Sequence, residues 1–204
     1  MNERKNMVME ISFVTSNQEK VKAVERSLAY ARRSDIKIKQ INLDIIEPQF
    51  DSVAEISKYK AMEAFKLLQS PVLVEDGGLV IPALDGFPGP YTKYVLKTIG
   101  ADGILRLLSG IADRSAKFVS FATFVDAGGR VQQFERRGDN FEIACERKDI
   151  VHPEAWSDLW QVIYLKKYGK MLCELSAQEL LEYTEQSETS GSLQQFVRWL
   201  VQTY

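Results

Sequence analysis

The apolar residues of the N-terminal part alternate between strand and helix spacing, and this alternation most strongly limits the folds open to the chain. Residues 10–15 (EISFVT) predict a short strand, and apolar side chains then recur at helical spacing over 21–31. Residues 36–45 predict a second strand, and residues 52–68 a helix that opens with a possible capping box. The apolar run 72–74 follows. The chain therefore begins as strand, helix, strand, helix, strand.

The second half is predicted to contain two short helices, a group of strands and two amphipathic helices. The predicted segments are, in order, helices 92–99 and 102–108, strands 117–125 and 130–137 of one hairpin, a strand within 140–146, and helices 156–164 and 193–201. Residues 190–192 offer an N-cap region for the last helix. Since no linker, repeat or low-complexity tract divides the chain, we expect a single domain over residues 1–204.

Charge, cysteine and histidine counts exclude several classes of protein. The 26 basic and 28 acidic side chains supply no global positive field for a nucleic-acid polymer or an anionic membrane. The charged N-terminus and the lack of a long apolar stretch predict a cytoplasmic protein without a membrane partner. Because the cytoplasm is reducing, Cys145 and Cys173 are expected to be buried apolar residues rather than a disulfide. Because His152 is the only histidine, a zinc site with two or three histidines is excluded.

A polar turn, residues 15–20 (TSNQEK), lies where the first predicted strand passes into a helix. The start of a helix exposes backbone N–H groups and the positive end of the helix dipole, so it attracts anions. The Thr15 hydroxyl, the Asn17 amide and the Lys20 ammonium would complete an anion site. The alternative is ordinary helix capping, with Lys20 on a solvated face.

Two adjacent carboxylates, Glu75 and Asp76, follow the apolar run 72–74 and precede two glycines. Carboxylates at a strand end, where the backbone turns through glycines, can coordinate a hard divalent cation and orient a water molecule. The alternative is a tight Asp-Gly turn with solvated acids. Both interpretations place a turn at Gly77 and Gly78.

A third acid and two lysines extend this constellation. Glu47 follows the second predicted strand, Lys60 lies in the next predicted helix, and Lys93 comes after the glycines. An acid at position 47 can share one cation with the carboxylate pair, while the lysines neutralise phosphate oxygens. The alternative for each is a solvated surface charge.

Four segments together resemble the inosine triphosphate pyrophosphatase family in order and spacing: SFVTSNQEK, Glu47, PVLVEDGGLVIPALDGFPGPYTKYVLKTIG and KFVSFATFVDAGGRVQQFE. The resemblance covers residues 11–146 and is most specific over 71–94. It implies an α/β fold with a long mixed central sheet, flanking helices and two lobes around a nucleotide cleft. It also implies a homodimer that uses Mg²⁺ to cleave aberrant purine nucleoside triphosphates, such as ITP and XTP, into monophosphate and pyrophosphate.

The resemblance also implies roles for individual residues. Asp76 and Glu75 are the implied catalytic residues, and Glu47 and Asp76 the implied Mg²⁺ ligands. The implied substrate contacts are Thr15, Ser16, Asn17, Lys20, Lys60, Gly77, Lys93 and Trp160. Ser16 stands where many members of the family have glycine.

The C-terminal third departs from the family pattern. Members carry a Phe-Gly-Tyr/Trp-Asp-Pro segment, a Glu-Lys-Asn and a Ser-His-Arg that surround and read the base. Residues 158–162 align with the first segment, so the aromatic is kept as Trp160 and the aspartate becomes Gln161. The lysine is absent near Leu180, and Ser-Gly-Ser at 190–192 replaces Ser-His-Arg.

These losses predict an altered base preference, because a cation aimed at the purine O6 favours a keto base over a 6-amino base. Gln161, Lys166 or Lys167 would preserve the selectivity if one of them donated to the same oxygen. Trp156 and Tyr164, like Trp160, can stack on a base, and packing of an amphipathic helix explains them equally well.

We therefore expect a Mg²⁺-dependent nucleoside triphosphate pyrophosphohydrolase with altered base preference. One alternative is a nucleotide-binding regulator that has lost turnover. The other is an ordinary ITP/XTP pyrophosphatase whose base-reading residues come from other segments.

Overall fold

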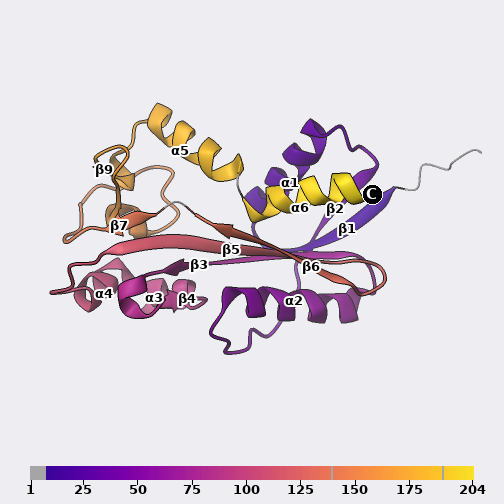
Figure 1. The fold of residues 1–204 in the computed structure, drawn as a ribbon, viewed down its shortest axis with the longest axis horizontal. Helices are drawn as coiled ribbons and strands as arrows, with labels where there is room; N and C mark the ends of the chain where they lie inside the picture. Colours follow the sequence, from indigo (N-terminus) through magenta and orange to yellow (C-terminus); the bar gives the residue numbers. More distant parts are fainter. Residues whose placement is uncertain (1–7, 139, 190) are drawn as a thin grey trace, which may run out of the picture.

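A computed structural model describes residues 8–138, 140–189 and 191–204. Within these residues a nine-stranded mixed sheet has the order β2-β1-β3-β5-β7-β8-β9, with β4 paired to β3 and β6 paired to β5. Helices cover both faces of this sheet (Figure 1). The expected α/β fold, with a long mixed central sheet and flanking helices, is therefore confirmed.

The elements have the following bounds. The strands are β1 Met9–Val14, β2 Ile36–Ile41, β3 Val72–Val80, β4 Pro88–Gly89, β5 Ser115–Val125, β6 Val131–Arg137, β7 Phe141–Ile143, β8 Ile163–Leu165 and β9 Lys170–Met171. The α-helices are α1 Gln18–Tyr30, α2 Val53–Leu68, α3 Thr92–Thr98, α4 Gly100–Leu107, α5 Ala177–Thr189 and α6 Ser192–Thr203. Short 3₁₀ turns are η1 Pro82–Leu84, η2 Asp158–Gln161 and η3 Leu172–Glu174.

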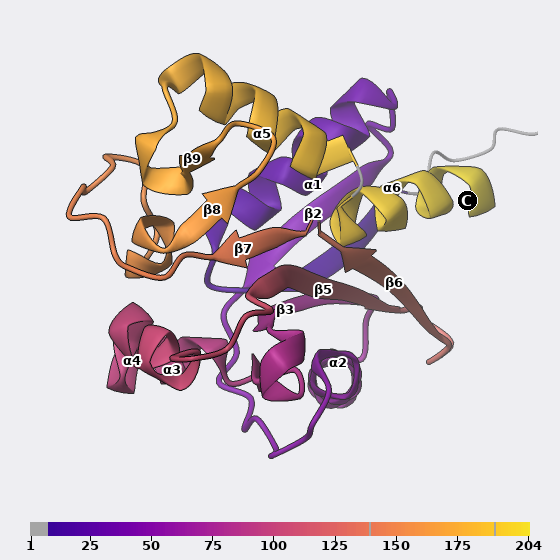
Figure 2. The same ribbon diagram turned by 60° about the vertical axis from the view of Figure 1, so that its left-hand side comes forward.

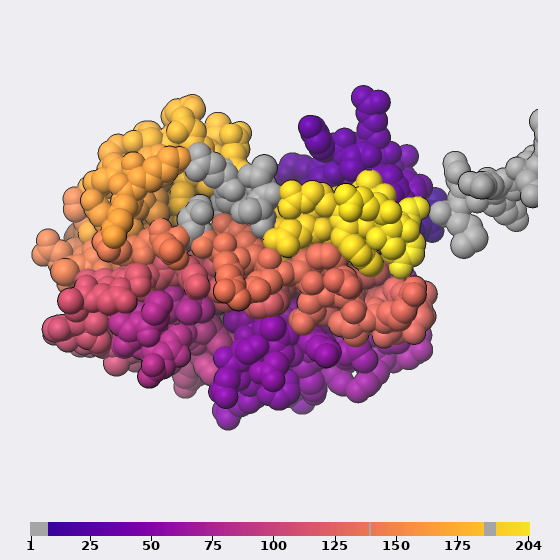
Figure 3. All heavy atoms as spheres, viewed as in Figure 1, coloured from indigo at the N-terminus to yellow at the C-terminus, as the bar shows by residue number. Residues whose placement is uncertain are grey.

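Two helical layers enclose the N-terminal half of the sheet. Helices α1 and α6 lie side by side on one face, and α2 lies on the other (Figures 1 and 2). In the space-filling view, α6 rests on the β5–β6 hairpin beside α1 (Figure 3). Leu73 of β3 packs with the α1/α6 layer, whereas Val72 and Val74 pack with α2. Because side chains alternate along a strand, odd-numbered residues of β3 face the α1/α6 layer and even-numbered residues face α2.

Strand β3 continues through the two glycines, so the turn expected at Gly77 and Gly78 is wrong. Its residues from Val72 to Val80 pair without a break with β5. The glycines serve another purpose. A side chain on Gly78 would collide with the carbonyl oxygen of Gly89, which lies on the neighbouring strand β4. The close approach of two strands, and not a reversal of the chain, therefore requires glycine there.

A second core lies where β3 and β5 extend beyond α2. Leu79 of β3 packs there with Ile104 of α4, Phe141 of β7 and Ile163 of β8. Helix α5 lies over this part of the molecule, on the same side of the sheet as α1 and α6 (Figure 1). The long strands β3 and β5 thus connect the two cores.

The helix expected over residues 156–164 is wrong. The segment forms the 3₁₀ turn η2 and then strand β8, which pairs with β7. All five residues from Leu159 to Ile163 are buried, so this part of the segment has no exposed polar face. The apolar spacing that suggested an amphipathic helix comes from a buried stretch, 159–163, together with Trp156, which is exposed.

Other expectations hold in part. The strand expected over 36–45 ends at Ile41, and the strand expected within 140–146 is the short β7, which pairs with the start of β5 rather than extending the hairpin. Helix α5 was not predicted. Ser190 lies outside the described residues, and Gly191 is the N-cap of α6.

The cysteines and the hydrophobic lengths of the helices give further outcomes. Cys145 and Cys173 are both free, but Cys145 is exposed and therefore not the buried residue that was expected. No helix among the described residues is long and apolar enough to cross a membrane.

Candidate active site

The polar turn after β1 caps α1. The Asn17 side chain accepts hydrogen bonds from the backbone N–H groups of Glu19 (2.9 Å) and Lys20 (3.4 Å), and Thr15 Oγ1 accepts one from the Asn17 N–H (3.1 Å). The capping interpretation is therefore correct for Asn17. It is wrong for Lys20, which forms an ion pair with the Glu75 carboxylate and also donates to the Glu75 carbonyl oxygen (3.3 Å).

Strand β3 extends past the end of β1, and this places the two acids at an open strand edge. Strand β1 pairs with β3 only at Ser12 with Val72 and at Phe13 with Leu73. From Glu75 to Gly77 the edge of β3 that faced β1 is free of strand partners among the described residues, because β4 joins that strand only at Leu79. The loop that follows β1 can therefore lie against the backbone of β3.

Alternation along β3 sends the two carboxylates to opposite faces of the sheet. Glu75 faces the α1 layer, where it meets Lys20. Asp76 faces the α2 layer, where its Oδ1 lies 2.7 Å from Lys60 Nζ. The same ammonium lies 2.8 Å from Glu47 Oε1. One lysine therefore holds two acids that are 29 positions apart in the sequence.

The charges at this site are partly removed from water, and their pKa values respond. Burial raises the pKa of Asp76, although the positive charges of Lys60 and Lys20 oppose the change. Burial alone would lower the pKa of Lys60, but the neighbouring Asp76 and Glu47 outweigh it and raise that pKa. The ammonium stays charged, and Asp76 is more basic than an ordinary aspartate.

A cavity of about 370 Å³ collects these residues, and we call it the strand-end cavity. Its lining includes every predicted catalytic, metal-binding and phosphate-side residue: Thr15, Ser16, Asn17, Lys20, Glu47, Lys60, Glu75, Asp76, Gly77 and Lys93. Trp160 is the one predicted site residue that lies elsewhere. Segments that are far apart in the sequence thus form one polar pocket.

Two polar lining residues were missed by the sequence interpretation. Asn42 and Asp44 also line the strand-end cavity, directly after β2. Strands β1 and β2 are parallel, so their carboxyl ends open at the same edge of the sheet. Polar residues just after residues 36–41 were a signal that could have identified both.

The acids of the strand-end cavity match the ligands that a magnesium ion takes. Glu47 and Asp76 already share one cationic atom, Lys60 Nζ, and Asp76 Oδ2 is buried without a hydrogen-bond partner among the described residues. No cluster of three or more His, Cys, Asp or Glu side chains in the described part of the chain could hold a metal alone. Two carboxylates fit Mg²⁺, which is usually bound by one or two carboxylates together with substrate phosphates and water.

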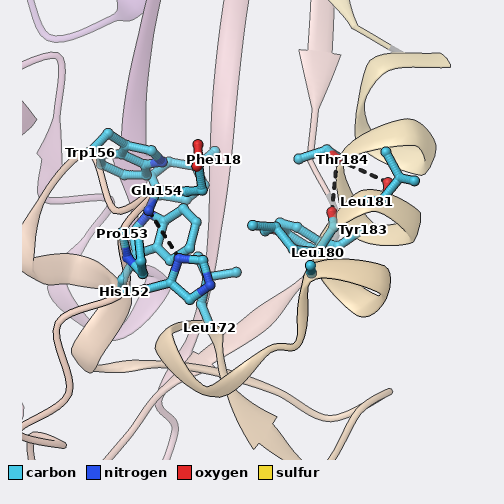
Figure 4. A pocket seen from close by; sticks show the side chains of 12 residues that line it. Phe118, His152, Pro153, Glu154, Trp156, Leu172, Leu180, Leu181, Tyr183 and Thr184 are labelled. Carbon is cyan, nitrogen blue, oxygen red and sulfur yellow. Dashed lines mark hydrogen bonds between the residues drawn. The ribbon is translucent and has the colours of Figure 1, made fainter.

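A second, larger cavity lies in the C-terminal part, and we call it the aromatic cavity. It has a volume of about 730 Å³, and the lining that matters here is Phe118, His152, Trp156, Trp160, Tyr183 and Thr184. In Figure 4, Trp156 and Phe118 form one wall and the side chains of α5 form the other, with a gap between them. The rings of Phe118 and Trp156 meet edge to face at 5.7 Å between centroids.

The aromatic residues of this region divide between core and cavity. Trp160 is 4% exposed and stacks against His152, with 5.1 Å between ring centroids, so packing explains most of its surface. Trp156 is 59% exposed and stands at the cavity wall. Tyr164 lies in β8 and is not part of this wall. Among the aromatics considered, Trp156 has the largest open face for stacking.

The three side chains considered as alternative donors to the base are engaged elsewhere. The Gln161 amide is buried and donates to the Ile150 carbonyl oxygen (3.0 Å). Lys166 forms an ion pair with Glu142 (2.7 Å), and Lys167 lies over the ring of Tyr168. None of the three lines the aromatic cavity.

Part of the chain is similar in sequence to known pyrophosphatases. The chain is 44% identical over 126 residues to a dITP/XTP pyrophosphatase of Methanopyrus kandleri, covering 62% of this chain and 65% of that protein. It is 39% identical over 137 residues to inosine triphosphate pyrophosphatase 1 of Trypanosoma cruzi, covering 67% and 68%. The first match thus spans less than two thirds of the relative's own length.

The fold has counterparts among solved structures as well. A HAM1 protein from Coxiella burnetii superimposes with a TM-score of 0.76 at 21% identity, covering 96% of this chain and all of that one. At that identity the likeness concerns the fold. Residues 11–142 match the Ham1 family, which is well over half of the chain. The protein therefore belongs to the Ham1 family, and its resemblance to the inosine triphosphate pyrophosphatases is confirmed.

Proposed function

We propose that this chain is a nucleoside triphosphate pyrophosphohydrolase that uses Mg²⁺ and has an altered base preference. Water is added, the bond between the α-phosphorus and its bridging oxygen breaks, and the products are a nucleoside monophosphate and pyrophosphate. The observation that supports the proposal is the strand-end cavity, which gathers three lysines and four acids from separate segments. The relatives named as dITP/XTP and inosine triphosphate pyrophosphatases support the same reaction class.

The residues of the strand-end cavity divide the work by charge. Lys20, Lys60 and Lys93 offset the charge of the triphosphate and of the departing pyrophosphate. Asp76, whose pKa is raised by burial, positions the attacking water and accepts its proton, while Glu75 on the opposite face of β3 holds Lys20. When bound between Glu47 and Asp76, Mg²⁺ would supply further positive charge at the phosphate oxygens.

We propose the altered base preference because the aromatic cavity offers stacking and few donors. The lining of this cavity has no lysine or arginine within the described part of the chain. The site that lost a charged donor loses about 1.5 to 3 kcal/mol of that interaction, which is roughly one to two powers of ten in discrimination. ITP should therefore not exceed every standard nucleotide by a large margin.

A panel of nucleoside triphosphates tests both parts of the proposal. ITP, dITP, XTP, GTP, ATP and a pyrimidine set are assayed with Mg²⁺ and with a chelator, and pyrophosphate and orthophosphate are measured separately. We expect pyrophosphate and monophosphate as the first products, and loss of turnover with the chelator. Orthophosphate and diphosphate as first products would contradict the reaction class.

The same panel separates the two alternatives. A regulator without turnover would bind nucleotides and release no pyrophosphate. An ordinary ITP/XTP pyrophosphatase would show a kcat/KM for ITP or XTP about a hundredfold above that for every other nucleotide. So large a ratio is not expected of a site that has lost its charged donor. The second outcome would leave the reaction class standing and overturn the altered preference.

We further propose a single domain over residues 1–204 that acts as a cytoplasmic homodimer, without a nucleic-acid polymer or membrane partner. These points rest on the sequence alone. Light scattering of the purified protein would measure the oligomeric state, and a monomer at working concentration would contradict the homodimer.

A further inference from the structure

A small cavity shares a lining residue with the strand-end cavity and another with the aromatic cavity, and we call it the connecting cavity. Its volume is about 230 Å³, and its lining includes Ser120, Arg136 and Ser192. Glu75 lines both this cavity and the strand-end cavity, and Thr184 lines both this cavity and the aromatic cavity. Glu75 and Thr184 therefore mark where the connecting cavity lies next to the other two.

Strand register places Arg136 in line with the middle of the candidate site. Gly77 of β3 is opposite Ser120 of β5, and Ser120 is opposite Arg136 of β6. Neighbouring strands lie about 4.8 Å apart, so Arg136 is two strand spacings from Gly77. Phe118 precedes Ser120 by two positions and shares its face of the sheet. The guanidinium thus belongs to the face that carries both the Glu75 side chain and the aromatic wall.

The opposite side of the connecting cavity is fixed by α6. The hydroxyl groups of Ser120 and Ser192 lie 2.9 Å apart and join β5 to the first turn of that helix. Gly191 and Ser192 both line the cavity. Neither residue carries a charge. In the described residues, the first turn of α6 therefore has no cationic side chain, and Arg136 of β6 supplies one from the neighbouring strand.

We propose that Arg136 is the specificity-determining residue that reads the base. The proposal rests on the function proposed above, since it assumes a triphosphate in the strand-end cavity and a base stacked at the aromatic cavity. A nucleotide in that pose crosses the connecting cavity between its triphosphate and its base. The edge of the base that faces this cavity then lies toward Arg136. Guanidinium groups only donate hydrogen bonds, so Arg136 favours bases with a keto oxygen and disfavours bases with an amino group at that position.

Few other side chains can play this part. Among the residues that line the aromatic and connecting cavities in the described chain, Arg136 is the only lysine or arginine. The lysines of the strand-end cavity are placed at the acids and the triphosphate side. The selectivity that remains after the loss of the C-terminal donors is therefore assigned to one residue of a strand.

The test compares base preference in wild type, Arg136→Ala and Arg136→Lys. Wild-type turnover of the nucleotide panel is measured first, because it tests the proposed function independently. Replacement by alanine should lower kcat/KM for ITP, XTP and GTP by about ten- to a hundredfold and change that for ATP by less than about threefold. Lysine keeps the charge but not the planar guanidinium group. The ratio of kcat/KM for ITP to kcat/KM for ATP in Arg136→Lys should therefore lie between those of wild type and Arg136→Ala.

Arg137→Ala is the matched control. Arg137 is the next residue of β6, points to the other face, is 68% exposed and pairs with Glu135 at 2.7 Å. Its loss should leave every ratio unchanged. Thermal unfolding tests whether each variant is folded. If Arg136→Ala does not fold, the ratio of kcat/KM for ITP and ATP is measured in Arg136→Gln instead.

The outcomes separate the two proposals. No pyrophosphate from any nucleotide in the wild type would overturn the proposed function. Wild-type turnover with an equal loss for all nucleotides in Arg136→Ala would assign Arg136 to the phosphates or the ribose and overturn the inference alone. An unchanged ratio of ITP to ATP would also overturn it.

Discussion

The strand-end cavity and the aromatic cavity are organised by different forces. At the strand-end cavity, charged side chains from distant segments hold one another, as Lys60 does between Glu47 and Asp76. At the aromatic cavity no ion pair among the described residues links the walls in the same way, and the Thr184 hydroxyl donates to carbonyl oxygens of its own helix. The first region is electrostatically arranged before any ligand arrives, and the second offers shape and apolar surface.

This difference matches the extent of the similarity to known proteins. The Ham1 match ends at residue 142, so it includes the strand-end cavity and strands β3, β5 and β6. It excludes residues 150–189, which supply most of the aromatic walls. Changes in the first region should therefore alter turnover of every nucleotide, whereas changes in the second should alter how nucleotides are bound and distinguished.

Replacement of Asp76 by asparagine should have the largest effect. It removes the negative charge and the proton acceptor that face Lys60, and we expect a loss of about 10² or more in kcat for all nucleotides. Steady-state assays with two different bases measure the loss. If turnover of only one base fell, the separation between the two regions would be wrong.

The control for this variant is Asp102→Asn. Asp102 lies in α4, its side chain is 57% exposed, and its contact with Arg147 is long at 3.5 Å. Exposed pairs of this kind contribute little, so activity and stability should stay near wild type. Activity of Asp76→Asn within a few-fold of this control would move the catalytic role to another residue.

Local patterns predicted the elements that are governed by local interactions. The Ser52 side chain accepts a hydrogen bond from the Glu55 N–H (3.2 Å), as the capping signal indicated, and helix α6 follows its apolar period. The unbroken strand β3 could not be predicted, because Gly77 and Gly78 are held extended by pairing with β5, about 40 positions away. A glycine pair gives the same local signal in a turn and at a close strand contact.

Some residues of the candidate site could likewise be identified from local sequence patterns, and others could not. Glu75, Asp76 and Lys20 stand next to strand and helix ends, so their sequence positions already marked them. Arg136 gives no such signal, because a charged residue near the end of a hairpin strand usually points to solvent. Its place opposite Ser120 depends on the register of β5 with β6 and on α6, which arrives from the end of the chain.

Replacement of Trp156 by alanine should have an intermediate effect, confined to binding. Its exposed ring is the part of the aromatic wall open to a base, and stacking of a base on an aromatic side chain contributes about 1 kcal/mol or more, roughly fivefold in affinity. We expect KM to rise by that factor for purines while kcat stays close to wild type. Initial rates over a range of ITP and ATP concentrations measure both constants.

Tyr30→Ala controls for the loss of an exposed aromatic residue. Tyr30 ends α1 and is 94% exposed, away from the cavities described above. Its KM should not change. A fall in kcat in Trp156→Ala, at unchanged KM, would connect the aromatic wall to the chemical step and break the comparison drawn here.

The smallest expected effect concerns the first turn of α5, which carries one wall of the aromatic cavity. Glu179 accepts hydrogen bonds from the Ser176 N–H (2.8 Å) and from Lys170 Nζ (2.6 Å), and these interactions lower the pKa of Glu179 to about 2. A carboxyl whose pKa is lower in the folded than in the unfolded state stabilises the fold above its ordinary pKa. That contribution is lost as the pH falls from the ordinary value of 4.5 toward about 2.

Glu179→Gln should therefore be less stable than wild type at neutral pH, by an amount that stays constant down to about pH 5 and shrinks at lower pH. The difference between the two proteins isolates this carboxyl, since the other acids titrate in both. Denaturant unfolding at a series of pH values measures it. The gap concerns the wall and not the charged residues of the strand-end cavity, so kcat at neutral pH should be unchanged while KM rises slightly. A stability gap that did not depend on pH would show that the Lys170 and Ser176 contacts do not hold the Glu179 carboxylate, and the wall would then depend on packing of α5 alone.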